Sequence, residues 1–165
     1  MVYKKQVDNE SQWETDPMLE IVNRCAEFRG VDLKNRLKSK RRRGRYGNVN
    51  EWSPLRISTS KTRGDGYYTG RCYGRSINGN PSTRKKGNIY LGLPHATYTP
   101  IGEDEEVERE FDKEHFAQVV LHEVDHLLGL THSEMMDSRE LDTPDLSDIT
   151  VRPKQEHRIK QKVKQ

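Results

Sequence analysis

Residues 119–137, VVLHEVDHLLGLTHSEMMD, form one of the few strongly apolar segments of this chain, yet they contain three histidines and several acidic residues. Only 31% of the 165 residues are hydrophobic while 33% are charged, so we expect a small hydrophobic core. A chain of this length folds as one domain around a single core. That core must therefore accommodate the polar side chains of this segment.

We expect one domain over residues 1–150 and a basic, flexible tail over residues 151–165, VRPKQEHRIKQKVKQ. No apolar run approaches the roughly 18 to 20 residues that a transmembrane helix requires. The first residues, MVYKKQVDNESQWETDP, lack the apolar centre of a secretory signal. These features predict a soluble chain with no membrane partner and with the cytoplasm as the default location. They do not indicate an oligomeric state.

Two helices are expected before residue 43. Residues 17–28 carry apolar residues at helical spacing after Asp16, which takes the N-cap position before a proline in the first turn. Gly30 marks the end of this helix. Residues 32–42 predict a second, basic helix, whose apolar face is short.

The remainder of the chain predicts a small sheet and one long helix. Residues 44–100 are rich in turn-forming residues and contain three β-type runs, LRIST, YYTGRCY and NIYLGL. The acidic residues 102–110 are expected to open a helix that continues to Gly129, with carboxylates near its positive N-terminal end. This order of elements favours an α+β fold.

The histidines have the spacing of metal ligands on that long helix. His122 and His126 are four residues apart, so their imidazoles lie on one face and can converge on one ion. Glu123 projects beside that pair, where a carboxylate can reach a metal-bound water. Gly129 allows the chain to leave the helix, so that His132 can return to the same ion. Three nitrogen ligands with an open fourth position are typical of catalytic zinc.

A histidine on a helix face is more often solvated or bonded within the core than bound to a metal. Here five positions are fixed together, in the order His, Glu, His, Gly, His. At usages of about 2% for His and 6 to 7% for Glu and Gly, chance gives this pattern in roughly one of 10⁴ to 10⁵ such chains. The pattern therefore predicts a Zn²⁺ site.

The motif HEVDHLLGLTH, residues 122–132, resembles the HExxHxxGxxH pattern of the metzincin clan of zinc metallopeptidases. By this resemblance the zinc ligands are His122, His126 and His132, and the catalytic general base is Glu123. The resemblance implies a zinc-dependent endopeptidase whose substrate is a protein or peptide.

The clan also has a methionine in a tight turn beneath the metal, for which Met135 and Met136 are the candidates here, although both follow His132 more closely than is usual in the clan. Its architecture implies a small twisted mixed sheet, an N-terminal helix and a zinc-bearing active-site helix below a cleft. This description agrees with the α+β order of elements expected from the residues themselves.

Two other zinc families are similar over parts of the motif. Peptide deformylases share HExDHL, which includes Asp125 here, but take a cysteine in a glycine-containing motif as third ligand. Neither Cys25 nor Cys72 has that setting. A bacterial endoribonuclease family of ribosomal RNA maturation has three histidines at the same spacing, with glycine in place of Glu123.

The alternative function is therefore a zinc-dependent endoribonuclease that uses the same three histidines. Two basic segments, residues 38–45 and 151–165, can contact phosphate backbones and keep this alternative open. A third class, a nucleic-acid-binding or assembly protein with structural zinc, does not account for Glu123, because a structural site needs no base.

The peptidase hypothesis assigns proton transfer to Glu123, which takes a proton from water and later delivers it to the leaving amine. Asp125 either holds a basic partner or a ligand's outer nitrogen, or is solvated. Tyr90, His95 and Tyr98 are candidates for stabilising an oxyanion. His115 and His157 lack ligand-like spacing to the motif.

Residues 86–94, KGNIYLGLP, are expected to form either an edge strand, to which an extended substrate would add, or an ordinary internal strand. Two cysteines are too few for a disulfide framework, although one bridge between Cys25 and Cys72 is possible. Cys25 is also a candidate for the open zinc position if the N-terminal region is a pro-segment.

Overall fold

The computed structural model describes residues 7–30, 41–44, 47–50, 55–59, 68–73, 76–77, 80–81, 88–127 and 142–159, which form an α+β fold. The helices are α1 (Thr15–Phe28), α3 (Lys113–Leu127) and the 3₁₀-helix η2 (Gln155–His157). The strands are β1 (Val7–Glu10), β2 (Arg41–Gly44), β3 (Gly47–Asn50), β4 (Leu55–Thr59), β5 (Thr69–Tyr73), β6 (Ser76–Ile77), β7 (Asn80–Pro81), β8 (Asn88–Leu93), β9 (Thr97–Tyr98) and β10 (Val107–Glu108). Neither α1 nor α3 has the length and apolar content needed to cross a membrane.

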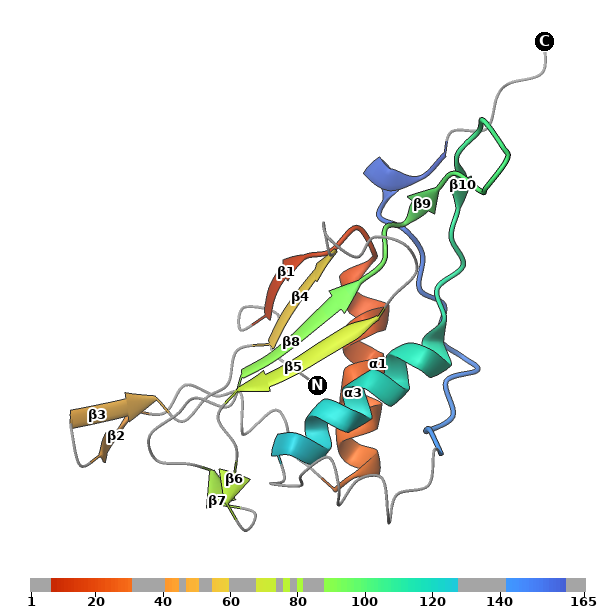
Figure 1. Ribbon diagram of the computed structural model, residues 1–165. Coiled ribbons are helices and arrows are strands. Elements are labelled where there is room, and N and C mark those ends of the chain that lie inside the picture. The colour runs from red at the N-terminus through yellow and green to blue at the C-terminus, as the bar shows by residue number, and fades with distance from the viewer. Residues whose placement is uncertain are drawn as a thin grey trace.

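Four strands form a mixed sheet in the order β1-β4-β8-β5 (Figure 1). The pairs β1–β4 and β4–β8 are parallel, whereas β5 runs antiparallel to β8. Leu91 of β8 lies opposite Ile57 of β4 on one side and Gly70 of β5 on the other. The other strands form three antiparallel pairs, of which β9–β10 lies beyond one end of the sheet.

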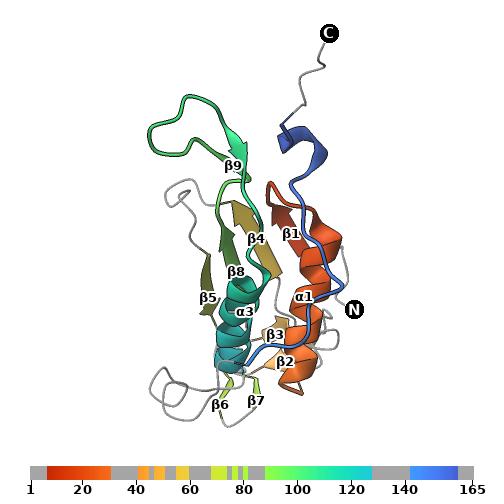
Figure 2. The ribbon, with the colours of Figure 1, turned by 90° about the vertical axis from the view of Figure 1, so that its right-hand side faces the viewer.

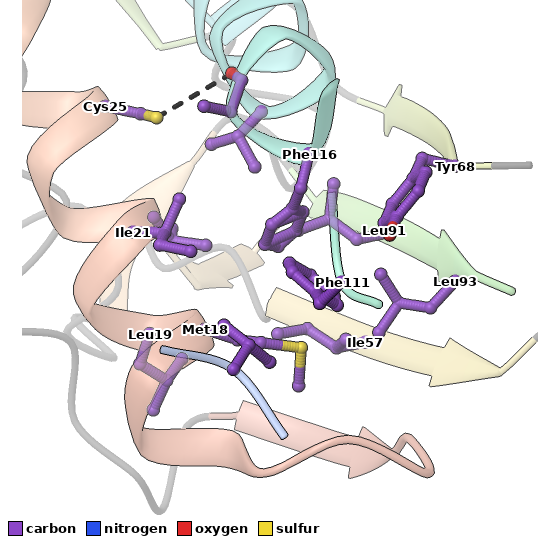
Figure 3. Close-up of a cluster of buried hydrophobic side chains, with 14 of the residues drawn as sticks. Met18, Leu19, Ile21, Cys25, Ile57, Tyr68, Leu91, Leu93, Phe111 and Phe116 are labelled. Carbon is purple, nitrogen blue, oxygen red and sulfur yellow. Dashed lines mark hydrogen bonds between the residues drawn. The ribbon is translucent and has the colours of Figure 1, made fainter. Parts of the chain in front are cut away.

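Both helices cover the same face of the sheet (Figure 2). The side chains of Ile89, Leu91 and Leu93 alternate along β8 and are buried beneath the helices, because successive residues of a strand point to opposite faces. Figure 3 shows α1 and α3 contributing their apolar faces to this core, together with Phe111. The largest fully buried side chains include Trp13, Met18, Ile21, Ile57, Phe116, Val120 and Val124.

The predicted N-terminal helix is confirmed as α1, which begins two residues earlier than expected. Its N-cap is Glu14, whose side chain makes no capping hydrogen bond, and Asp16 lies in the first turn. Gly30 ends the helix as predicted, with φ +69° and its N–H donating to the carbonyl of Glu27 at 2.9 Å. Most of the predicted basic helix, residues 32–40, lies outside the described residues, and its last two residues belong to strand β2.

The three β-type runs form β4, β5 and β8 as predicted. Of the two alternatives for residues 86–94, the internal strand is confirmed and the edge strand is wrong for the described part, because β8 is hydrogen-bonded to β4 on one side and to β5 on the other. Strands β5 and β1 are the two edges of the sheet among the described strands. The buried side chains of β8 favour this internal position, since an internal strand is covered by its neighbours.

The acidic segment does not open the long helix, contrary to the sequence prediction. Residues 102–110 form a loop and strand β10, which pairs with β9, and Gly102 takes a left-handed conformation with φ +84°. Helix α3 begins only at Lys113, after Asp112, whose Oδ1 accepts a hydrogen bond from the N–H of His115 at 3.0 Å. An aspartate cap of this kind outweighs a run of like charges, which repel one another along a helix.

Part of the expected flexible tail is structured against the N-terminal segment. The N–H of Glu14 donates to the carbonyl of Arg152 at 2.9 Å, and the N–H of Lys154 donates to the carbonyl of Gln12 at 2.7 Å. Val151 is buried. The chain is therefore part of the fold to residue 159, and residues 160–165 lie outside the described residues.

Residues 146–149, which precede Val151, are hydrogen-bonded to both helices. The guanidinium group of Arg24 on α1 binds both carboxylate oxygens of Asp148. The ammonium group of Lys113 on α3 donates to the carbonyl oxygens of Leu146 and Ile149 at 3.0 and 2.6 Å. These contacts hold the first turn of α3 in place.

Trp13 joins the N-terminal segment to the sheet and the core. Its side chain is fully buried, its indole N–H donates to the carbonyl of Pro94 at 3.0 Å, and its ring packs edge-on against Phe111 at 5.0 Å. Trp13→Ala should lower the free energy of unfolding in urea by about 3–5 kcal/mol, because it leaves a large cavity and an unsatisfied carbonyl. The matched variant Ile101→Ala, at a fully exposed position, should change it by less than about 0.5 kcal/mol. Equal effects of the two variants would contradict this packing.

Candidate metal centre

Residues 122–127 of the motif occupy the C-terminal half of α3, which packs against α1 and β5. The apolar residues Val120 and Val124 of this helix are fully buried in the core. Glu123 and His126, on the same part of the helix, are also buried. Burial of a carboxylate or an imidazole is unfavourable without a partner. Helix α3 therefore carries polar groups into the protein interior at the positions that the sequence singled out.

The imidazoles of His122 and His126 are in contact across one turn of α3. Their Nε2 atoms are 3.2 Å apart and their ring centroids 4.7 Å apart, with the rings nearly perpendicular. Two nitrogens at this distance either share a proton or bind one ion. Tetrahedral zinc with Zn–N bonds of 2.0–2.1 Å separates two ligand nitrogens by about 3.3 Å. The pair therefore fits two adjacent positions of a zinc site.

The third predicted ligand, His132, lies outside the described residues, as do Gly129, Met135 and Met136. Among the residues that the structure describes, no three His, Cys, Asp or Glu side chains come together as a metal site. The structure thus brings together two of the three predicted ligands, and the complete set remains a prediction.

Glu123 is buried, with only 3% of its surface exposed. Its Oε2 atom has no hydrogen-bond partner within the described part of the chain. Burial raises the pKa of this carboxyl group to about 7, because removal from water disfavours the charged form. A carboxyl group with a pKa near neutrality can both accept and release a proton, as a general base must. The orphaned oxygen also leaves one acceptor available for a water molecule or a cation.

Asp125 has a basic partner, which is one of the roles predicted for it. Its Oδ1 accepts a hydrogen bond from Nε of Arg29 at 3.0 Å, and both side chains are almost fully buried. Arg29 is the C-cap residue of α1. This buried ion pair therefore joins the end of α1 to the turn of α3 that carries His122 and His126.

Cys25 is a free thiol in the core rather than a group aimed at the site. It lies on α1, and its Sγ donates to the carbonyl of Ala117 at 3.7 Å (Figure 3). Burial raises the pKa of this thiol to about 12. Zinc binds the thiolate, so Cys25 is not prepared to fill an open zinc position. The possible bridge to Cys72 is also absent, since Cys25 is free.

The remaining candidates are distributed over other parts of the fold. Tyr90 lies on the sheet face away from α3, because its neighbours on β8 face the helices, and the guanidinium group of Arg56 lies 5.5 Å from its ring. Tyr98 is exposed on β9 and stacks with Arg109 at 4.4 Å. His95 and His157 line a cavity of about 680 Å³ between η2 and the β9–β10 hairpin.

His115 is exposed on α3, where its ring packs against Tyr68 at 5.1 Å. It lies in the first turn, whereas His122 and His126 occupy the second half of the helix. The structure thus places this histidine outside the pair, as its spacing predicted.

Two residues of the site were not predicted from the sequence. Arg29 carries no sequence signal that names its partner, because the pair forms between segments 96 residues apart. Gly70 lies against Glu123 from strand β5. A glycine inside a strand does indicate close backbone approach, and this signal was present in YYTGRCY.

Comparisons of the chain with models of protein families, with curated proteins and with solved structures found no match. The His122–His126 pair and the buried Glu123 are the two observations that bear most directly on the chemistry of the site.

Removal of one partner of the Arg29–Asp125 pair should destabilise the protein. Asp125→Ala leaves a guanidinium group buried without its carboxylate and should cost about 3–5 kcal/mol in the free energy of unfolding. The double variant Arg29→Met, Asp125→Ala should cost less than the sum of the two single changes. Urea unfolding of the four proteins measures this coupling, and additive costs would contradict a direct buried pair. Glu20→Ala, which removes a surface partner of Arg24, is the matched control and should have little effect.

The thiol of Cys25 should resist modification in the folded protein. Its burial and raised pKa keep it protonated at pH 8, and the thiolate is the reactive form. Incubation with iodoacetamide followed by peptide mass spectrometry should show Cys25 unmodified in buffer and fully modified in urea. Rapid modification in buffer would show that α1 does not cover this residue.

Proposed function

We propose that this protein is a zinc-dependent endopeptidase similar to the metzincins. The observation that supports it best is the His122–His126 pair, with Nε2 atoms 3.2 Å apart, on the same helix as Glu123, which directly follows His122 and is buried. These three residues form the HExxH part of the motif and have the side-chain types that metal-assisted hydrolysis requires.

The zinc ion would be held by His122, His126 and His132. When bound, zinc supplies a Lewis acid that polarises a carbonyl group and acidifies water. The two helical imidazoles are held in a fixed orientation by the buried faces of α3, which reduces the entropy lost when ligand and substrate bind. Glu123 takes the proton of the attacking water and delivers it to the leaving amine.

The substrate is proposed to be an extended peptide that adds to strand β5. This strand is antiparallel to β8 and forms one of the two edges of the sheet among the described strands. It also packs against α3, so a peptide paired with it would pass close to Glu123. A peptide that adds to a sheet edge forms main-chain hydrogen bonds, which do not depend on most of its side chains.

The alternative proposal is a zinc-dependent endoribonuclease with the same ligands. Residues 41–43, which are three consecutive arginines, belong to the β2–β3 hairpin, and a concentration of arginine can bind a phosphate backbone. Glu123 favours the peptidase, because a carboxyl group beside the ligands supplies the proton transfers of amide hydrolysis.

The peptidase proposal predicts different results for the base and for the ligands. Glu123→Gln should retain zinc but lower kcat for peptide cleavage by about 100-fold or more, because only proton transfer is lost. His122→Ala, His126→Ala and His132→Ala should lower the zinc content as well, as measured by elemental analysis. His115→Ala, an exposed histidine on the same helix, is the matched control and should retain both.

Peptide and RNA substrates separate the two proposals. The zinc-loaded protein is incubated with casein and, separately, with a structured RNA, each with and without a chelator. Peptide cleavage that the chelator abolishes supports the endopeptidase, and chelator-sensitive RNA cleavage supports the alternative. Peptide cleavage by Glu123→Gln at the parental rate would exclude Glu123 as the base.

A further inference from the structure

Strand β5 has no side chain at the point where it faces α3. Gly70 is opposite Leu91 of β8, and opposed residues of neighbouring strands point to the same face of the sheet. The side chain of Leu91 is buried on the face that the helices cover. The position of a side chain at residue 70 is therefore directed at α3.

Glu123 and Val119 of α3 fill this position. A Cβ atom built on Gly70 would lie 2.7 Å from Cγ and 2.9 Å from Oε1 of Glu123, and 2.9 Å from Cγ1 of Val119. Non-bonded carbon atoms pack at about 3.5–4.0 Å, so even an alanine does not fit without movement. The closest atom, Cγ, is in the middle of the glutamate side chain, which must change its rotamer to give way.

We propose that Gly70 is a positioning residue that allows the side chain of Glu123, the residue directly after His122, to occupy its buried place between α3 and β5. The absence of a side chain on β5 provides the space, and the strand backbone closes it against water. Glu123 is consequently 3% exposed. The catalytic consequence of this inference rests on the proposed function, whereas the packing of Gly70 on Glu123 does not.

Gly92 of β8 offers a matched control. Its neighbours Leu91 and Leu93 are buried beneath the helices, so the position of its side chain is on the opposite face of the sheet. A Cβ atom there would meet the side chain of Thr69 rather than α3. Gly92→Ala therefore crowds the same pair of strands, at the hydroxyl oxygen of Thr69, without contact to Glu123.

The packing is tested by urea unfolding of Gly70→Ala in two backgrounds. In the otherwise unchanged protein the added methyl group should lower the urea midpoint, because Glu123 must leave its place. In the Glu123→Ala background the closest contacts are gone, so the same change should lower the midpoint much less. An equal shift in both backgrounds would overturn the proposal. This test requires no enzymatic activity.

The positioning role is tested by steady-state kinetics of the zinc-loaded protein on a peptide. Gly70→Ala should lower kcat by about 100-fold, as expected for a misplaced catalytic group, while KM and zinc content stay at the parental values. Gly92→Ala should retain the parental kcat. Addition of Val119→Ala to Gly70→Ala relieves only the valine contact and should not restore kcat.

The outcomes separate this inference from the proposed function. Restoration of kcat by Val119→Ala, or a parental kcat in Gly70→Ala, would overturn the positioning role. If the unchanged protein cleaves no peptide, the proposed function fails. The urea experiment then still decides whether Gly70 provides the space for Glu123.

Discussion

The burial of a carboxyl group on the inner side of α3 is the constraint around which the described structure is arranged. Glu123 is removed from water, and one of its oxygens has no partner among the residues that the structure describes. Such burial costs free energy and contributes nothing to the hydrophobic core. Polar groups that are retained at this cost are typical of functional sites. Here the buried carboxyl group belongs to the residue that directly follows His122, whose ring lies edge-on to that of His126.

The rest of the fold keeps α3 in the orientation that this arrangement requires. The ion pair of Arg29 and Asp125 joins the C-terminal half of α3 to α1. Lys113 joins the first turn of α3 to residues 142–159 through hydrogen bonds to two carbonyl groups of that segment. Phe116 of α3 packs its ring into the core (Figure 3). Val120 and Val124 of the same helix are also fully buried. A site on a helix that is fixed at both ends and along one face keeps its ligands within a narrow range of positions.

Local features of the chain could be predicted from the sequence because they depend on neighbouring residues. Apolar spacing and Gly30 gave the extent of α1, alternation gave the three central strands, and the four-residue spacing placed His122 and His126 together. Features that depend on distant partners could not be predicted. The internal position of β8 depends on pairing with two other strands, and the order of residues 152–159 depends on hydrogen bonds to the N-terminal segment. The start of α3 was missed because the cap at Asp112 outweighed the charge pattern before it.

The central claim is that three imidazoles, two of them from α3, bind one zinc ion with a carboxyl group beside them. X-ray absorption spectroscopy of the zinc-loaded protein tests this claim most directly, because it reports the kind and number of ligand atoms. The account predicts three imidazole nitrogens at about 2.0–2.1 Å, one further light atom and no sulfur. A sulfur ligand at about 2.3 Å, or fewer than three imidazoles on the metal, would contradict it.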